Sequence, residues 1–296
     1  MDELDFSKPA QPKPQPQAQP AAPPAPKQVY NAGMALEFFR AGGKPEGAAA
    51  GTKFFEENER AGFLKRDKMY LLIEGEVTLV RRGKVIDIVK AGEIFGEMAA
   101  ISESPRSAAA VAKTECRVIA LDDKDFLKAL AIKPEFALML MSMMILRLRG
   151  MLARLAQNNT LSDDDSSSQS RVFDKDMVAA LAKGLGHNAM SRHNAGASIF
   201  KEGAAGALAY VVLEGRIAVS IKDKIVQRVG PGGIFGELAL IDQSTRAASA
   251  TAETDCALVS LNRAVFVNLV KANPEFGAAL LGAVAERMRF IAARVK

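Results

Sequence analysis

The sequence lacks several residues on which common functions depend. It has no tryptophan, and its 296 residues include only two cysteines (Cys116 and Cys256) and two histidines (His187 and His193). Two cysteines cannot build the disulfide framework of a small secreted domain. Two histidines are too few for most metal sites or catalytic triads. We interpret the histidines as surface residues and the cysteines as small buried ones.

Long apolar segments and dense blocks of positive charge are also missing. The longest apolar run, residues 136–146, is well short of the roughly 18 residues that a membrane span needs. The N-terminus, MDELDF, has neither the basic nor the apolar region of a secretory signal. Lys and Arg are spread along the chain and the net charge is only +5, which gives nucleic-acid binding little support. We therefore expect a cytoplasmic protein that binds neither membrane nor nucleic acid.

What the sequence does contain is a long internal repeat. An offset of 140 carries FGEMAAISESPRSAAA (95–110) onto FGELALIDQSTRAASA (235–250), and no gap is needed from Glu74 to Arg149. Upstream the offset becomes 145, so the first copy has five extra residues, most simply a longer hairpin loop. A period this long indicates two whole domains and excludes a solenoid of small units.

Two segments outside the copies differ from them in composition. Residues 7–27 are rich in Pro, Gln and Ala, which predicts a disordered tail that is either a spacer or a ligand for a polyproline reader. Residues 158–170 are acidic and Ser-rich, which predicts a flexible linker. The predicted layout is a tail at 1–28, a first domain at 29–157, a linker at 158–171 and a second domain at 172–296.

Both copies predict the same order of secondary structure. A short helix is expected at 30–40 and at about 174–185, followed by short alternating β-type runs such as 116–122. A long amphipathic helix then begins at Pro134 or Pro274, where proline suits a first helical turn. The predicted fold class is mainly β with flanking helices (α+β). It consists of two tandem β-rolls or jelly rolls, each followed by a long C-terminal helix.

The repeated motif holds an acid and a cation nine residues apart in both copies. It comprises Gly96, Glu97 and Arg106 in the first copy and Gly236, Glu237 and Arg246 in the second. The glycine permits a sharp turn, the helix start after it attracts an anion, and the guanidinium matches a phosphate. A carboxylate would repel phosphate and so suits a hydroxyl donor. The motif therefore favours a nucleotide ribose with its phosphate; a plain Glu–Arg salt bridge is the alternative.

At this point the residues resemble a known family. Residues 92–110 and 232–250 are similar nearly throughout to the phosphate-binding cassette of the cyclic-nucleotide-binding domain family, F-G-E-[LIVM]-A-L-[LIV]-x-x-x-P-R-[AST]-A. That family includes the catabolite activator protein, regulatory subunits of cAMP-dependent kinase and cyclic-nucleotide-gated channels. The resemblance covers about 54–157 and 197–296, most of the chain outside the tail and linker.

The resemblance implies a role for each cassette residue. The Glu would accept the ribose 2′-OH, the Arg would pair with the exocyclic phosphate oxygens, and backbone N–H groups, such as those of Ala99 and Ser107, would complete the cradle. The implied ligand-binding residues are Gly96, Glu97, Met98, Ala99, Arg106, Ser107 and Ala108, with Gly236, Glu237, Leu238, Ala239, Arg246, Ala247 and Ala248. The base would lean on the long helices, near 134–156 and 274–295.

The residue after the arginine bears on the choice of base. In the family, Ala at this position accompanies cAMP and Thr accompanies cGMP. Ala247 therefore favours cAMP, whereas Ser107 leaves cGMP open at the first domain. The chain departs from the family pattern at Thr245, where Pro is favoured, and at Ala100, where Leu is usual. Neither departure removes a group expected to contact the ligand.

The output of such a sensor is the least determined part of the prediction. The sequence contains no helix-turn-helix, kinase or channel segment, so we expect a non-enzymatic sensor that regulates an unknown protein partner or its own assembly. The helix at 134–157 is apolar on more than one face. The apolar face that does not cover its own domain is expected to meet another helix, either of the same chain or of a second subunit in a homodimer. The alternatives are a ligand-free interaction scaffold, a cyclic di-GMP effector and, as the weakest, a DNA-binding regulator.

Overall fold

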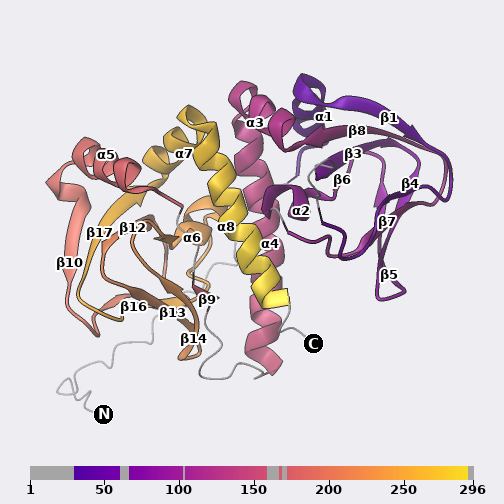
Figure 1. Cartoon of the computed structure of the whole chain (residues 1–296). Helices are drawn as coiled ribbons and strands as arrows, with labels where there is room; N and C mark the ends of the chain where they lie inside the picture. Colours follow the sequence, from indigo (N-terminus) through magenta and orange to yellow (C-terminus); the bar gives the residue numbers. More distant parts are fainter. Residues whose placement is uncertain (1–29, 61–66, 103, 159–166, 169–171, 293–296) are drawn as a thin grey trace, which may run out of the picture.

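The computed structural model describes residues 30–60, 67–102, 104–158, 167–168 and 172–292. The predicted tail, and all of the predicted linker except Asn158, Ser167 and Ser168, lie outside the described residues. Figure 1 shows two β-rich units on either side of two long central helices. The predicted fold class, mainly β with flanking helices in two tandem units, is confirmed.

The first repeat forms two antiparallel sheets, ordered β1-β8-β3-β6 and β2-β7-β4-β5. Its strands are β1 (Lys44–Ala48), β2 (Lys53–Phe55), β3 (Lys68–Glu74), β4 (Glu76–Arg81), β5 (Lys84–Lys90), β6 (Ile94–Phe95), β7 (Ala109–Ala112) and β8 (Cys116–Asp122). Its helices are α1 (Ala32–Gly42), α2 (Glu97–Ser102), α3 (Asp123–Ile132) and α4 (Glu135–Asn158). The short helix α2 therefore lies between β6 and β7, on the repeated motif.

The second repeat has the same order of elements, with two additions, a 3-10 turn and a further short strand. Its strands are β10 (Met190–His193), β11 (Ser198–Phe200), β12 (Leu208–Glu214), β13 (Ile217–Ile221), β14 (Lys224–Val229), β15 (Ile234–Phe235), β16 (Ser249–Ala252) and β17 (Cys256–Asn262). Its helices are α5 (Lys175–Leu185), the 3-10 turn η1 (His187–Ala189), α6 (Glu237–Asp242), α7 (Arg263–Ala272) and α8 (Pro274–Ala292). The additional strand is β9 (Ser167–Ser168), which pairs in parallel with β14. The sequence analysis did not foresee this strand inside the predicted linker.

The repeat extends to strand register and helix capping. Tyr70 lies opposite Phe95 in the first sheet, and Tyr210 lies opposite Phe235 in the second, each at the offset of 140. A side chain caps the helix that follows β8 and the helix that follows β17. Asp122 and Asn262 each accept a hydrogen bond from the backbone N–H of the residue three positions later. The same local sequence thus produces the same local structure twice.

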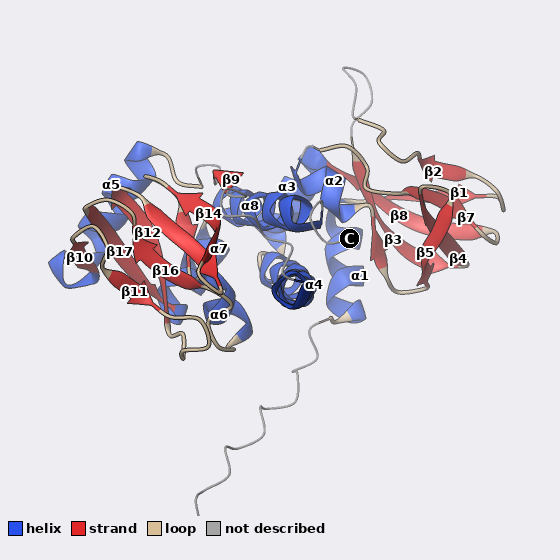
Figure 2. Cartoon of the chain, turned by 90° about the horizontal axis from the view of Figure 1, so that it is seen from below, coloured by secondary structure: helices blue, strands red, loops and turns tan. Residues whose placement is uncertain are grey.

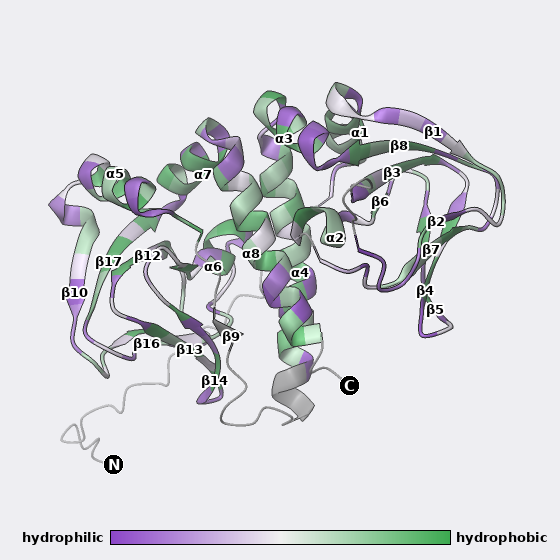
Figure 3. Ribbon diagram, viewed as in Figure 1, coloured by the Kyte–Doolittle hydropathy of each residue, from purple (hydrophilic) through white to green (hydrophobic). Residues whose placement is uncertain are grey.

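The long helices α4 and α8 form the centre of the molecule. The largest cluster of buried apolar side chains includes residues of both repeats, among them Phe38 and Phe136 of the first and Leu261 and Phe276 of the second. Figure 3 shows the apolar stretches of α4 and α8 side by side between the two β units. The predicted surplus face of α4 therefore meets a helix of the same chain.

Helix α4 is more apolar than the sequence analysis recognised. Its segment Glu135–Arg154 has a mean hydropathy of 1.6, and by length and composition alone it would suffice to cross a membrane. Half of its most apolar 18-residue stretch is buried inside the protein. Its composition therefore has an explanation in packing between the two repeats.

Each short helix also touches the long helix of the other repeat (Figure 2). A Cβ built on Gly282 of α8 would lie 3.7 Å from the carbonyl oxygen of Ile101 in α2. On the other side, Arg149 of α4 donates two hydrogen bonds to Asp242 at the end of α6, at 2.5 Å and 3.1 Å. The packing of the two repeats is therefore crossed, and the motif helices are part of the contact.

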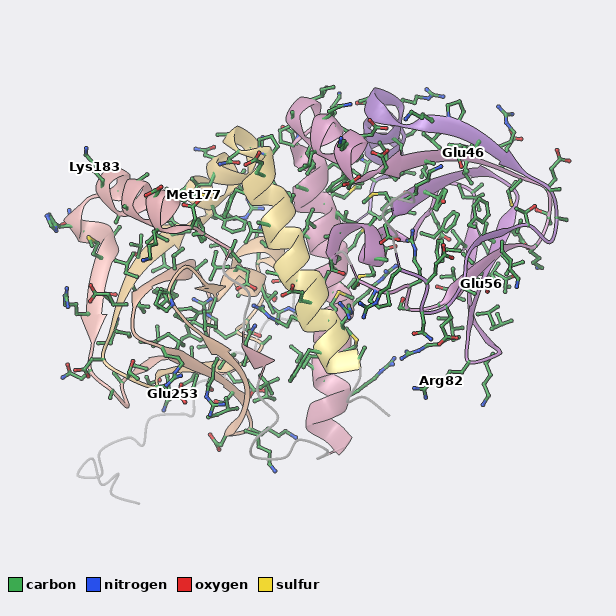
Figure 4. The ribbon with its side chains drawn as sticks, in the orientation of Figure 1. Glu46, Glu56, Arg82, Met177, Lys183 and Glu253 are labelled. Carbon is green, nitrogen blue, oxygen red and sulfur yellow. The ribbon has the colours of Figure 1, made fainter. Side chains whose placement is uncertain are left out.

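The outer edges of the two repeats differ. In the second repeat β9 covers the edge strand β14. In the first repeat β5 ends its sheet among the described residues, and Val85 and Ile86 on it are 62% and 54% exposed. Figure 4 shows labelled side chains on these outer parts, including Glu46 and Arg82, away from the central helices.

Candidate functional site

Each repeat has a cavity beside its short helix, and the predicted site residues line it. The first cavity, site 1, is lined by Gly96, Glu97, Met98, Ala99, Arg106, Ser107 and Ala108, together with residues of β5 and α4. The second, site 2, is lined by Gly236, Glu237, Leu238, Ala239, Arg246, Ala247 and Ala248, together with residues of β14 and α8. The structure thus gathers the whole predicted set around two cavities; that these residues bind a ligand stays a prediction.

The two arginines are buried and held by the backbone. Arg106 and Arg246 are each 5% exposed. Arg106 donates to the carbonyls of Gly96 and Lys68 at 2.8 and 2.9 Å, and its counterpart makes the same two bonds at 2.7 Å. Burial lowers the pKa of both guanidinium groups from the ordinary value. These bonds fix each cation at its cavity wall before any ligand arrives.

An aromatic ring supports each arginine. The guanidinium carbon of Arg106 lies 4.1 Å from the centre of the Phe55 ring, and that of Arg246 lies 4.0 Å from the centre of the Phe200 ring. Cation–π contacts of this kind stabilise a partly desolvated cation. The two phenylalanines match across the repeat at the offset of 145, but the sequence analysis assigned them no role at the site.

Glycine is required at the turn before each short helix. Gly96 and Gly236 adopt φ values of +75° and +78°. A Cβ there would lie 3.0 Å and 2.7 Å from the Nη1 atoms of Arg106 and Arg246. The glycines therefore allow both the left-handed turn and the close approach of the arginine.

The two arginines differ in their counter-ions. In site 1 the Nη2 atom of Arg106 lies 3.0 Å from the carboxylate of Asp67. At the offset of 140 the second repeat has Ala207 instead, and no carboxylate of the described residues forms a salt bridge with Arg246. The Nε atom of Arg246 is also buried without a hydrogen-bond partner among the described residues. A buried guanidinium without a counter-ion is costly, and an anion in the cavity would offset that cost.

The two glutamates are buried and paired with arginines of the long helices. Glu97 and Glu237 are 7% and 2% exposed. Arg147 of α4 donates to Glu97 at 2.9 Å, and Arg287 of α8 donates to Glu237 at 2.5 Å. The anticipated alternative, a Glu–Arg salt bridge, is thus present, but its cation is not the arginine of the motif.

These helix arginines are not among the site residues predicted from the sequence. Arg147 and Arg287 line their cavities, and Leu152 of α4 lines site 2 although it belongs to the first repeat. The signal for the arginines was available, since they match at the offset of 140 within the region expected to hold the base. No local pattern marked Leu152.

Other candidate chemistry is limited in the described part of the chain. No group of three or more His, Cys, Asp or Glu side chains there is arranged to hold a metal ion. Cys116 and Cys256 are buried and free, as expected for small core residues.

Comparison with known proteins identifies the fold family. The sequence profile described as "Cyclic nucleotide-binding domain" matches residues 49–133 and 191–273, which together exceed half of the chain. The chain belongs to the cyclic nucleotide-binding domain family. Each match contains one complete set of the cassette residues, and the resemblance inferred from the sequence is confirmed.

Two of the relatives in this family are named as regulators. A cAMP-dependent protein kinase regulatory subunit from Eremothecium gossypii is 32% identical over 40% of this chain and 24% of its own length. A CRP-like cAMP-activated global transcriptional regulator from Mycobacterium tuberculosis is 30% identical over 38% of this chain and 51% of its own. The alignments thus span about a quarter to a half of these relatives.

Solved structures also match the chain. The regulatory domain of Toxoplasma gondii PKA in co-crystals with cAMP is 22% identical, with 82% of this chain and 87% of that chain covered and a TM-score of 0.30.

Proposed function

We propose that this cyclic nucleotide-binding protein is a non-enzymatic sensor of a cyclic mononucleotide, with cAMP as the preferred ligand. The observation that carries the proposal is that each cavity is lined by both a buried arginine fixed by backbone carbonyls and a buried glutamate. The first offers positive charge to a phosphate and the second accepts from a ribose hydroxyl. Ala247 beside Arg246 supports adenine at site 2, whereas Ser107 leaves cGMP open at site 1.

The effect of ligand binding on the rest of the protein is proposed from the packing of α4 and α8. Each cavity is lined partly by a long helix, and the two long helices pack on each other in the centre of the molecule. A ligand that interacts differently with two helix arrangements shifts their populations. Since two relatives are named as regulators, we propose that the rearranged helices act on a protein partner, or on assembly of the chain itself, in the cytoplasm.

Calorimetric titration with cAMP, cGMP and cyclic di-GMP tests the function. We expect cAMP to bind, and Arg106→Ala and Arg246→Ala each to weaken one site at least tenfold. A charge-assisted hydrogen bond contributes about 1.5–3 kcal/mol, and about 1.4 kcal/mol corresponds to tenfold.

Three outcomes would contradict the proposal. No heat with any of the three nucleotides would indicate an interaction scaffold. Binding of cyclic di-GMP alone would indicate a dinucleotide effector. Unchanged affinity in both arginine variants, with circular dichroism confirming that they fold, would show that the cavities are not the binding sites.

A further inference from the structure

The strands β5 and β14 occupy the same place in their sheets, but among the described residues only β14 has a partner on its outer side. The strand β9 runs parallel to β14, with Ser167 opposite Gln227 and Ser168 opposite Arg228 (Figure 1). Gln227 is 5% exposed, whereas Asp87 at the matching position of β5 is exposed to solvent. The backbone groups along an open edge pair readily with a further strand. The edge of β5 is therefore available for a strand like β9.

The open edge also carries apolar side chains. Val85, Ile86 and Ile88 of β5 are 62%, 54% and 37% exposed. The counterpart of Ile86 at the offset of 140 is Val226, which is only 5% exposed. Scattered exposed apolar residues are ordinary, but several together on one strand mark an interaction site. A strand added beside β5 would remove part of this apolar surface from water.

The chain enters both repeats at the same turn. Tyr30 and Phe173 directly precede the residues that cap α1 and α5. The hydroxyl of Tyr30 donates to the carbonyl of Gly92, just after β5. The N–H of Phe173 donates at 2.9 Å to the carbonyl of Gly232, which matches Gly92 at the offset of 140. In the second repeat the chain reaches this turn after pairing with β14, so the segment before Tyr30 arrives at the equivalent end of β5.

The residues before Tyr30 suit an edge strand in one register. Residues 24–29 read Pro-Ala-Pro-Lys-Gln-Val. Successive residues of a strand direct their backbone groups to opposite sides. If Pro24 and Pro26 face solvent, where a missing N–H is tolerated, Ala25 and Lys27 direct their N–H groups toward β5. Five extended residues span about 17 Å, which is enough to run from the turn to the middle of β5.

We propose that residues 24–29 dock in parallel on β5 and complete the outer edge of the first repeat, as β9 does for the second. So short a strand opens often, and the edge of β5 is then accessible at intervals. Both β5 and Tyr30 line site 1, so the docked segment would run beside that cavity. The proposal goes beyond the proposed function and does not depend on it.

Hydrogen exchange of the full chain, without nucleotide, tests the docking with two neighbouring substitutions. Lys27→Pro removes an N–H that faces β5 in the proposed register. It should speed exchange of the outward-facing amides of residues 87–90 about fivefold relative to the unsubstituted chain, the effect of one lost hydrogen bond. Gln28→Pro removes an N–H that faces solvent and should change this exchange by less than about twofold. Exchange of β14 should stay the same in both variants.

Three results would overturn the docking. The first is equal exchange of β5 in the unsubstituted chain and the Lys27→Pro variant. The second is an equal effect of Lys27→Pro and Gln28→Pro, which would exclude the proposed register. The third is slower exchange of β5 at higher protein concentration, with a dimer in sedimentation, which would assign this edge to a second copy of the chain.

Discussion

At the scale of the residue, the feature that most needs an explanation is the burial of charge. Arg246 has two backbone carbonyls and a phenylalanine ring as partners, but no carboxylate of the described residues. Arg106 has the same partners and the carboxylate of Asp67 in addition. A bound anion would be the carboxylate-free Arg246's counter-ion, whereas at site 1 it would share the positive charge of Arg106 with Asp67. The second site is therefore the more dependent on its ligand for electrostatic balance.

A second feature at this scale is a pair of turn glycines in the second repeat, which leads to a stability prediction. Gly215 has φ +79°, and a Cβ built on it would lie 2.1 Å from the carbonyl oxygen of Asp255. Gly196 has a similar φ of +82° with no atom of the described residues within 4 Å of such a Cβ. Gly196→Ala should cost only the left-handed strain, about 1–2 kcal/mol. Gly215→Ala should cost about 3 kcal/mol or more, because the clash with backbone adds to it.

Urea unfolding of the two variants measures this difference. Equal losses of unfolding free energy, within about 0.5 kcal/mol, would contradict the close approach at Gly215.

The site residues predicted from the sequence lie close to one another along the chain. Glu97 and Arg106 are nine residues apart, so their spacing and their recurrence were visible without a structure. Arg147 lies 50 residues from Glu97 and reaches it only because α4 has one particular rotation against the sheets. No local pattern encodes that rotation. The repeat marks Arg147 as a candidate at the offset of 140, but its contact with Glu97 was not predictable.

At the scale of the element, α4 serves both repeats. Its Arg147 reaches the short helix of its own repeat, and its Arg149 reaches the short helix of the other. The sequence predicted a long helix with a surplus apolar face, because the composition exceeds what one sheet can cover. The partner of this apolar face depends on long-range packing. The sequence therefore left open whether a helix of the same chain or of a second subunit covers it.

The Arg149–Asp242 pair, with side chains 20% exposed on both partners, is predicted to stabilise the docking of α4 on α6. In a double-mutant cycle of Arg149→Met and Asp242→Asn, we expect a coupling energy of roughly 1–3 kcal/mol. The exposed pair Arg117–Glu74, with side chains 69% and 60% exposed, serves as the control and should give less than about 1 kcal/mol.

Urea unfolding of the four proteins in each cycle provides both coupling energies. A value for Arg149–Asp242 no larger than that of the control would show that the bidentate contact does not hold the two elements together.

At the scale of the whole molecule, the two repeats share one core. The largest buried apolar cluster extends from Phe38 of the first repeat to Ile291 of the second through the seam between α4 and α8. Repeats joined only by a linker would unfold separately. These repeats have a common interior, and we expect them to unfold together.

Calorimetric unfolding tests the shared core. The unsubstituted chain should show one transition. Ala137 is 1% exposed, and its Cβ lies 3.5 Å from a Cβ built on Gly277 of α8, so Ala137→Glu places an unpaired charge in the seam. That variant should unfold in two transitions or at a clearly lower temperature. Leu146→Glu, on a 55% exposed position of the same helix, should leave the single transition in place.

Two transitions in the unsubstituted chain would contradict the shared core. So would a seam variant that unfolds like the exposed control.

The difference between the edge strands of the two sheets affects how the purified protein behaves at high concentration. The β14 margin carries its own short strand, while the β5 margin has no neighbouring strand among the described residues and exposes Val85 and Ile86. Margins of that kind recruit strands from neighbouring molecules when the protein is concentrated, unless charge keeps them apart. A lysine in place of Val85 would add charge to this margin and leave Ile86, which lines site 1, unchanged.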